Sequence, residues 1–190
     1  SILGYAMGNL LTGRAPNASG VLLLSLMAGL GFIGFLDDFA KIRQKQSLGL
    51  TPWMKVVGKA VIGIAFAVLV LQFRNGDNRT PATTRISFVR DTSIDLAVWG
   101  AVVGLILFVI WANFLITAWS NAVNLTDGLD GLAGGLLLFN YVVYAFITYS
   151  QGLFILSAIC MLIVGALIAF LWFNIKPAQF YMGDVGSLAL

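Results

Sequence analysis

The sequence predicts an all-α polytopic membrane protein, a bundle of five complete transmembrane helices with partial helices at both ends. Of its 190 residues, 59% are hydrophobic and only 10% are charged, whereas a soluble globular domain carries about 25% charged residues. Five apolar runs are long enough to cross the hydrocarbon core of a bilayer, which requires roughly 20 residues of helix. The net charge of +3 is too small to indicate a nucleic-acid partner.

The positions of the apolar runs define the expected helices. Complete spans are expected at about 20–36, 55–73, 96–119, 132–149 and 153–173, and partial helices at 2–11 and 186–190. Frequent Gly and Ala within these runs favour close helix packing in lipid. Because no polar segment is long enough to fold separately, residues 1–190 are expected to form a single transmembrane domain. Both ends interrupt apolar runs, so we expect a fragment of a longer protein.

The polar connections divide between two membrane faces when the crossings are counted. Connections 37–54, 120–131 and 174–185 fall on one face, and the long connection 74–95, which has room for a short hairpin, falls on the other. Five of the eight acidic residues lie in the first three connections, so we expect them to converge. Six basic residues belong to that face and five to the opposite one, which only weakly favours the cytoplasmic side.

The stretch GFLDDFAK, residues 34–41, places Asp37 and Asp38 where the first complete helix meets water. Adjacent aspartates repel unless a cation or a proton relieves them, so at least one is expected to be paired. Lys41 lies at i+3 and i+4 from the pair and would face both aspartates on a continued helix. A helix end with solvated charges accounts for the same residues.

The stretch NAVNLTDGLDGLAGG, residues 121–135, holds two more aspartates. In a helical conformation Asp127 and Asp130 share a face, with Asn124 one turn earlier. A charge at mid-bilayer costs about 2.5–3.5 kcal/mol, so this group is expected at the interface or in a wet cavity. Its glycines permit close approach of a ligand or another helix. The alternative is a polar loop in which Asp127 caps the next helix, and it accounts for only one of the two aspartates.

The stretch FNIKPAQFYMGDVGS, residues 173–187, presents one carboxylate between glycines. Pro177 ends the preceding helix, just after the polar Asn174. Asp184 on this backbone suits Mg²⁺, which takes one or two carboxylates and shares its other positions with phosphate oxygens. Asp184 as the N-cap of a helix that starts near Val185 is the alternative, and it is compatible with metal binding.

The chemistry of the three stretches has to rest on carboxylates, because the chain has no histidine and a single cysteine. Carboxylates and lysines at a membrane surface are typical of Mg²⁺-assisted handling of phosphates. A proton or cation pathway is less favoured, since none of the five carboxylates lies within an apolar run.

These three stretches resemble the signature motifs of the polyprenyl-phosphate N-acetylhexosamine-1-phosphate transferases, in order and in spacing. The resemblance implies a ten-helix, multi-pass protein of the bacterial inner membrane, usually a homodimer, with its active site on the cytoplasmic face. It further implies Mg²⁺-dependent transfer of phospho-N-acetylmuramoyl-pentapeptide from UDP-N-acetylmuramoyl-pentapeptide to undecaprenyl phosphate, which yields lipid I and UMP for peptidoglycan synthesis.

The resemblance also implies roles for individual residues. Asp37 and Asp38 match an aspartate pair that deprotonates or positions the lipid phosphate, and Asp184 matches the Mg²⁺ ligand. Tyr181 stands where the family usually has a Phe that stacks on uracil, and its ring keeps an aromatic face. The expected catalytic residues are Asp37, Asp38 and Asp184, and the expected substrate-binding residues are Lys41, Asn124, Asp127, Asp130, Asn174 and Tyr181.

Some parts of the family pattern are missing, among them a first helix and a histidine-rich cytoplasmic loop. We therefore expect residues 1–190 alone to be inactive, and robust lipid I formation by this fragment would contradict that expectation. The nearest alternative function is transfer of N-acetylglucosamine-1-phosphate to the same lipid. An ion-coupled transporter with carboxylates at mid-membrane depth and a non-catalytic scaffold are the alternatives from other classes.

Overall fold

The computed structural model describes residues 2–13, 15–44, 49–75, 80–87 and 91–190. Its helices are α1 (Ile2–Thr12), α2 (Ala18–Gln44), α3 (Pro52–Gln72), α4 (Ala101–Thr126), α5 (Leu132–Ser150), α6 (Phe154–Asn174) and α7 (Gly183–Ala189). Between α3 and α4 the chain forms β1 (Arg85–Ser87), β2 (Asp91–Asp95) and a 3₁₀ turn, η1 (Leu96–Trp99). Five charged residues that entered the face assignment lie outside the described residues: Arg14, Lys45, Asp77, Arg79 and Arg90.

The predicted fold class is confirmed. Five helices, α2 to α6, are long and apolar enough to cross a membrane. The hairpin expected in the long polar connection is also present, because β1 and β2 pair in an antiparallel ladder. The chain is therefore a multi-pass, all-α membrane protein with a small β-hairpin between two of its spans.

Two predicted helix ends are wrong, and both corrections affect the site. Helix α2 runs to Gln44 rather than ending near 36, so the Asp37–Asp38 pair is helical. Helix α4 begins at Ala101 and continues to Thr126, beyond the predicted end at 119. Both helices extend past their apolar runs because helical backbone satisfies its own hydrogen bonds whether lipid or water surrounds it. An apolar run therefore marks the depth of the bilayer rather than the length of the helix.

A third predicted end is also wrong, because α4 begins at Ala101 rather than at 96, and the turn η1 occupies Leu96–Trp99. The other helix bounds agree with the sequence to within three residues. Helix α7 begins at Gly183 rather than near 186, which brings Asp184 into its first turn. The turn η1 separates the hairpin from α4, and Gly100 joins them with a positive φ of 107°. That conformation is unfavourable for residues with a side chain, so the junction requires glycine.

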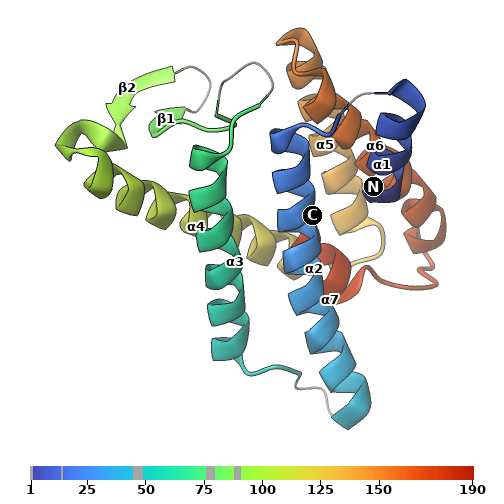
Figure 1. Cartoon of the computed structure of the whole chain (residues 1–190). Coiled ribbons are helices and arrows are strands. Elements are labelled where there is room, and N and C mark those ends of the chain that lie inside the picture. The colour runs from blue at the N-terminus through green and yellow to red at the C-terminus, as the bar shows by residue number, and fades with distance from the viewer. Residues whose placement is uncertain (1, 14, 45–48, 76–79, 88–90) are drawn as a thin grey trace.

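The helices form a bundle in which α5 packs against α6, and α2 against α7 (Figure 1). A buried apolar cluster joins α2, α5 and α6 at Leu24, Leu137 and Ile163. Helix α4 crosses α3 at a steep inclination (Figure 1). The hairpin and the α5–α6 turn lie at one end of the molecule, opposite the end where α2 terminates (Figure 1). This arrangement agrees with the predicted division of the connections.

Close contact between α2 and α7 depends on a glycine. A Cβ at Gly34 would overlap the backbone carbonyl oxygen of Asp184. One turn earlier, Gly31 faces Val185 and Ala189 at ordinary contact distance. Small residues let helix backbones approach closely in a membrane protein. Gly34 therefore allows the short helix α7 to lie directly against α2 and brings Asp184 to the aspartate pair.

Candidate functional site

Three carboxylates from two helices meet at the end of α2. Asp37 and Asp38 come from the last third of α2, and Asp184 comes from the first turn of α7. One oxygen from each residue lies within 4.8 Å of the others. The side chain of Asp37 is fully buried, while those of Asp38 and Asp184 are partly exposed. We call these three residues the carboxylate cluster.

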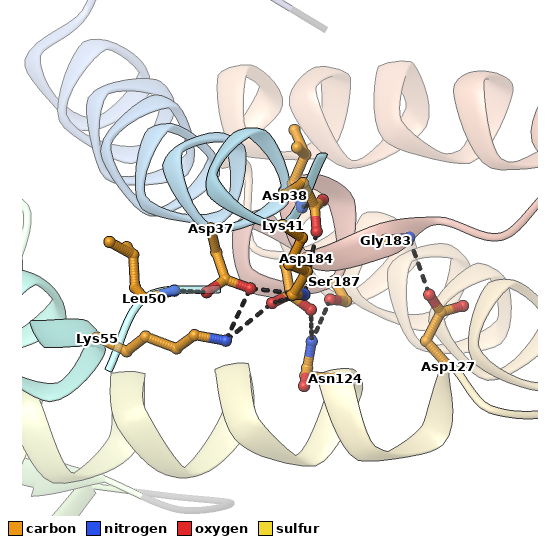
Figure 2. A network of polar contacts seen from close by, with 11 residues as sticks. Asp37, Asp38, Lys41, Leu50, Lys55, Asn124, Asp127, Gly183, Asp184 and Ser187 are labelled. Atoms are coloured by element: carbon orange, nitrogen blue, oxygen red, sulfur yellow. Dashed lines mark hydrogen bonds and ion pairs between the residues drawn. The ribbon is translucent and has the colours of Figure 1, made fainter. Parts of the chain in front are cut away.

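Two lysines bridge the carboxylate cluster (Figure 2). Lys41 Nζ lies 2.6 Å from Asp37, 3.3 Å from Asp38 and 3.0 Å from Asp184. Lys55 Nζ, from the first turns of α3, lies 2.9 Å from Asp37 and 3.0 Å from Asp184. The prediction that Lys41 faces the pair on a continued helix is thus confirmed. When all five groups are ionised, the arrangement retains one net negative charge.

Uncharged groups also donate hydrogen bonds to these carboxylates. Asn124 Nδ2 donates to Asp184 Oδ1 at 2.8 Å, and Ser187 Oγ also accepts from that amide at 2.8 Å (Figure 2). The backbone N–H of Leu50 donates to the buried Asp37 at 2.7 Å. The convergence predicted from counting crossings is confirmed for Asp37, Asp38 and Asp184, and the contacts to Asp184 come from α2, α3 and α4.

The pKa of Asp184 reflects two opposed effects. Burial disfavours its charged form, but the hydrogen bonds that Asn124, Lys55 and Lys41 donate to it outweigh that penalty. The pKa of Asp184 is consequently held well below its ordinary value. The carboxylate is therefore ionised throughout the physiological range, as a metal ligand has to be.

Asp127 lies at the C-terminal end of α4 and reaches the segment that leads into α7. It accepts a hydrogen bond from the backbone N–H of Gly183 at 3.0 Å (Figure 2). Burial raises the pKa of Asp127 and the nearby Asp184 charge adds to the rise, while the Gly183 and Met182 backbone hydrogen bonds oppose it. The idea that Asp127 caps the next helix is wrong: Gly131, in the left-handed conformation, precedes α5.

Asp130 and Tyr181 form a separate, exposed pair. The Tyr181 hydroxyl donates to Asp130 Oδ1 at 2.6 Å, and the backbone N–H of Ala178 donates to Asp130 Oδ2 at 3.3 Å. These two bonds lower the pKa of Asp130, and the same carboxylate raises the pKa of Tyr181. The helical arrangement of Asp127 and Asp130 is wrong, because α4 ends at Thr126. Both aspartates instead hold the segment that follows α6.

Asn174 is the last residue of α6 and is almost fully buried, with 1% of its surface exposed. Its side-chain oxygen accepts from the N–H of Gly131 at 3.0 Å, and its Nδ2 donates to the carbonyl of Phe180 at 2.9 Å. Asn174 therefore joins the α4–α5 connection to the segment before α7. The N-cap alternative for Asp184 is not borne out, since the N-cap is Met182, without a side-chain cap bond.

Sequence reasoning missed the site role of Lys55 and the contacts of Ser187 and Leu50. Lys55 and Lys59 were counted only as basic residues of one face. Their i, i+4 spacing at the start of an apolar run was the available signal, because lysines within a membrane helix face the protein interior or a cavity. No sequence pattern predicts a backbone donor such as the N–H of Leu50.

The oxygen donors fit a hard divalent cation. Mg²⁺ prefers carboxylate oxygens and binds through one or two of them together with phosphate oxygens. The carboxylate cluster supplies such oxygens on a face that is partly open to solvent. The ammonium groups of Lys41 and Lys55 lie between the same oxygens, so cation binding requires these lysines to turn toward another anion.

Fold and site together define a multi-pass membrane protein with a carboxylate and lysine site at one end of its helices. The family model described as glycosyl transferase family 4 matches residues 20–190, and the chain therefore belongs to that family.

Similar proteins share one name, phospho-N-acetylmuramoyl-pentapeptide-transferase. Over the whole of this chain, the relative from Beutenbergia cavernae is 53% identical, that from Kineococcus radiotolerans 46% and that from Streptomyces avermitilis 44%. The chain spans 57–58% of the length of these three relatives.

Proposed function

We propose that this chain forms the carboxylate-bearing part of a transferase that moves phospho-N-acetylmuramoyl-pentapeptide from its UDP conjugate to undecaprenyl phosphate. The products are lipid I and UMP. The observation that carries the proposal is the position of Asp184, which two lysines hold against Asp37 at the end of membrane-spanning helices. A site at the end of membrane-spanning helices lets a lipid phosphate meet a water-soluble nucleotide. The shared name of the relatives supports the choice of substrate.

In the proposed reaction an oxygen of the lipid phosphate attacks the sugar-linked phosphorus of the pyrophosphate. The bond from that phosphorus to the bridging oxygen breaks, and UMP leaves with the electron pair. Both reactants are anionic, so their approach is repulsive. Lys41 and Lys55 reduce this repulsion and stabilise the charge that develops on UMP. The two lysines lie in the cluster before substrate arrives, and they turn from the carboxylates toward the pyrophosphate oxygens when substrate and cation bind.

The residues of the carboxylate cluster have distinct proposed roles. Asp184 would hold Mg²⁺, with Asp37 and Asp38 as neighbouring oxygen donors. When bound, Mg²⁺ supplies charge neutralisation for the pyrophosphate oxygens. Asp38 is half-exposed and lies beside the N–H of Val185, so it is better placed than the buried Asp37 to meet the lipid phosphate as a base or as a positioning group.

The nucleotide is proposed to bind along the α4–α5 connection. Asn124 and Asp127 offer polar side chains beside the segment that leads into α7. Tyr181 is 51% exposed, and Asp130 anchors its hydroxyl. An anchored, half-exposed ring is suited to stacking on a uracil face. Asn174 is buried beneath this region, so its proposed contribution is to position Gly131 and Phe180.

The proposal includes a location and an assembly. We infer a bacterial inner membrane, a site open to the cytoplasm and a homodimer, all of which rest on the family resemblance. The bilayer itself is the partner of the apolar surface of α3 and α4. The transporter alternative is less favoured, because Asp127 and Asp130 lie in a connection rather than within a membrane-spanning helix.

A chimaera tests the activity. Residues 1–190 replace the matching segment of the Beutenbergia cavernae relative, and the purified protein receives undecaprenyl phosphate, Mg²⁺ and one UDP-sugar at a time. We expect a lipid product with UDP-N-acetylmuramoyl-pentapeptide, identified by its mass, together with one UMP per turnover. A product with UDP-N-acetylglucosamine instead would assign the sister reaction. An unaltered rate in the Asp184→Asn chimaera would contradict the proposed site and favour a scaffold.

A further inference from the structure

Lys59 is a buried lysine in the membrane-spanning helix α3 that has no part in the proposed reaction. Its residue is only 4% exposed and lies on the buried face of α3 with Gly63 and Ala67. Its Nζ donates to Asn121 Oδ1, on α4, at 2.5 Å. Across the described ranges of the chain, no carboxylate forms an ion pair with Lys59, in contrast to Lys55 one turn earlier.

The environment of Lys59 is unfavourable for an ammonium without an anion. The group has three donors, and one neutral amide oxygen accepts from it. Burying a charge costs far more than one neutral hydrogen bond returns, and apolar replacements of buried charges are often neutral or stabilising. The position therefore contributes little to folding, and an ammonium there is suited to an anionic ligand.

The location of Lys59 restricts the kind of anion. Lys55 and Lys59 are spaced i, i+4, so they lie along one side of α3 and lead from the carboxylate cluster into the span. Because Lys59 is shielded from water, a free anion would lose its hydration on the way to it. A phosphate on an apolar chain has the same cost, but its chain holds it at the membrane next to α3, which raises its local concentration there. Asn121, the present partner of Lys59, lies one turn before Asn124, the partner of Asp184.

We propose that Lys59 Nζ binds the phosphate monoester of a polyprenyl phosphate as the lipid approaches the carboxylate cluster, with the ammonium leaving Asn121 for the phosphate. The inference rests on the proposed function and adds a binding residue for the acceptor lipid. Lys59 acts before the chemical step, since Lys41 and Lys55 are the lysines at the reacting groups.

Binding measurements on the 190-residue chain in nanodiscs test this role. The ligands are a fluorescent short-chain polyprenyl phosphate, the matching polyprenol, and UMP as a soluble phosphate monoester. The variants are Lys59→Met, which keeps the length of the side chain without its charge, and Arg43→Met as the control. Arg43 is an exposed cation near the end of α2. We expect Lys59→Met to bind polyprenyl phosphate at least about tenfold more weakly, as for a lost charged hydrogen bond.

The same variant is expected to keep its affinity for polyprenol and for UMP, and to unfold at the same or a higher temperature. Unchanged polyprenyl phosphate affinity in Lys59→Met would overturn the inference and leave the proposed function standing. If Lys59→Met lost as much affinity for UMP as for polyprenyl phosphate, Lys59 would bind a soluble phosphate, and the proposal of a lipid phosphate would be overturned. Wild-type chain that binds polyprenol as tightly as polyprenyl phosphate would instead contradict the proposed function itself.

Discussion

Two aspartates at opposite ends of the molecule, Asp184 and Asp95, both have a lowered pKa, but for different reasons. Asp95 accepts from the backbone N–H of Ala97 and from Thr84, with Arg85 adding a weaker electrostatic contribution, and these bonds outweigh a small desolvation penalty. All of these partners belong to the hairpin or to the residues directly next to it. Asp184 is partly buried, and partners on three other helices outweigh the burial penalty.

This difference distinguishes the two ends of the molecule. Asp95 makes the local contacts of a helix cap, which stabilise a turn and need no tertiary structure. The contacts of Asp184 exist only when α2, α3 and α4 are packed together. The site end is therefore expected to be sensitive to helix packing, and the hairpin end is expected to tolerate change.

The largest effect is expected from Gly34→Ala. The added methyl group would overlap the carbonyl oxygen of Asp184, so α7 has to move away from α2. Overpacking of this kind costs about 1–3 kcal/mol of stability. We expect a lower unfolding temperature for the chain in detergent and a loss of transfer of about 100-fold or more in the chimaera, since a 1 Å displacement can have that effect.

Gly165→Ala is the matched control for this prediction. Gly165 lies in α6, and a Cβ there would meet nothing within 4 Å. Its replacement is expected to leave transfer and unfolding temperature unchanged or to raise the latter slightly, because Ala is the better helix former. Equal effects of the two substitutions would show that α2–α7 packing does not position Asp184.

A smaller effect, with a defined pH dependence, is expected from Asp127→Asn. A carboxyl whose pKa is raised by folding binds its proton more tightly in the folded state, so its contribution to stability falls as pH rises through that raised pKa. The Asn variant lacks this loss. Its unfolding temperature relative to wild type should therefore increase from pH 4 to pH 7, as measured by thermal unfolding in detergent.

Asp130→Asn provides a comparison of opposite sign. The pKa of Asp130 is lowered, so its stabilising contribution is present above its ordinary pKa and is lost as pH falls. Relative to wild type, this variant should become less stable as pH rises from about 2 to about 5, the range that includes the lowered and the ordinary pKa of Asp130. Parallel pH profiles for the two variants would contradict the assigned environments.

The smallest effect is expected from Arg85→Ala at the hairpin. Arg85 Nε lies 3.7 Å from Asp95 Oδ2, and the Arg85 side chain is 63% exposed. Exposed ion pairs contribute about 0–1 kcal/mol. We expect transfer by the chimaera within twofold of wild type and a change in unfolding free energy below about 0.5 kcal/mol. A tenfold loss of transfer would mean that the hairpin end takes part in the function.

The sequence predicted the fold class and the convergence of the acidic stretches well. Apolar runs of sufficient length leave a chain few choices, because backbone groups in lipid have to be satisfied within helices. Lys41 lies three and four residues after the aspartate pair, and residues at these spacings are neighbours on a helix. This spacing predicted its contacts with Asp37 and Asp38.

The rest of the site depends on tertiary contacts that no local pattern encodes. In the sequence, Gly34 cannot be told apart from the other glycines of α2. Its importance is visible only in the structure, where α7 lies against it. Lys55 and the N–H of Leu50 reach Asp37 because α3 folds back along α2. The spacing of Asp127 and Asp130 suggested a helix, but α4 ends at Thr126 with Asp127 as its C-cap, and Gly131 precedes α5 in the left-handed conformation.

Mn²⁺ replaces Mg²⁺ and is detected by electron spin resonance, so its binding shows whether Asp184 and the aspartate pair form a cation site at the lysine-bridged end. The chain is titrated in nanodiscs as wild type, Asp184→Asn and Asp95→Asn. We predict one Mn²⁺ site that Mg²⁺ displaces, present in wild type and in Asp95→Asn, and weakened at least about tenfold in Asp184→Asn. Equal Mn²⁺ binding by all three proteins would contradict the account.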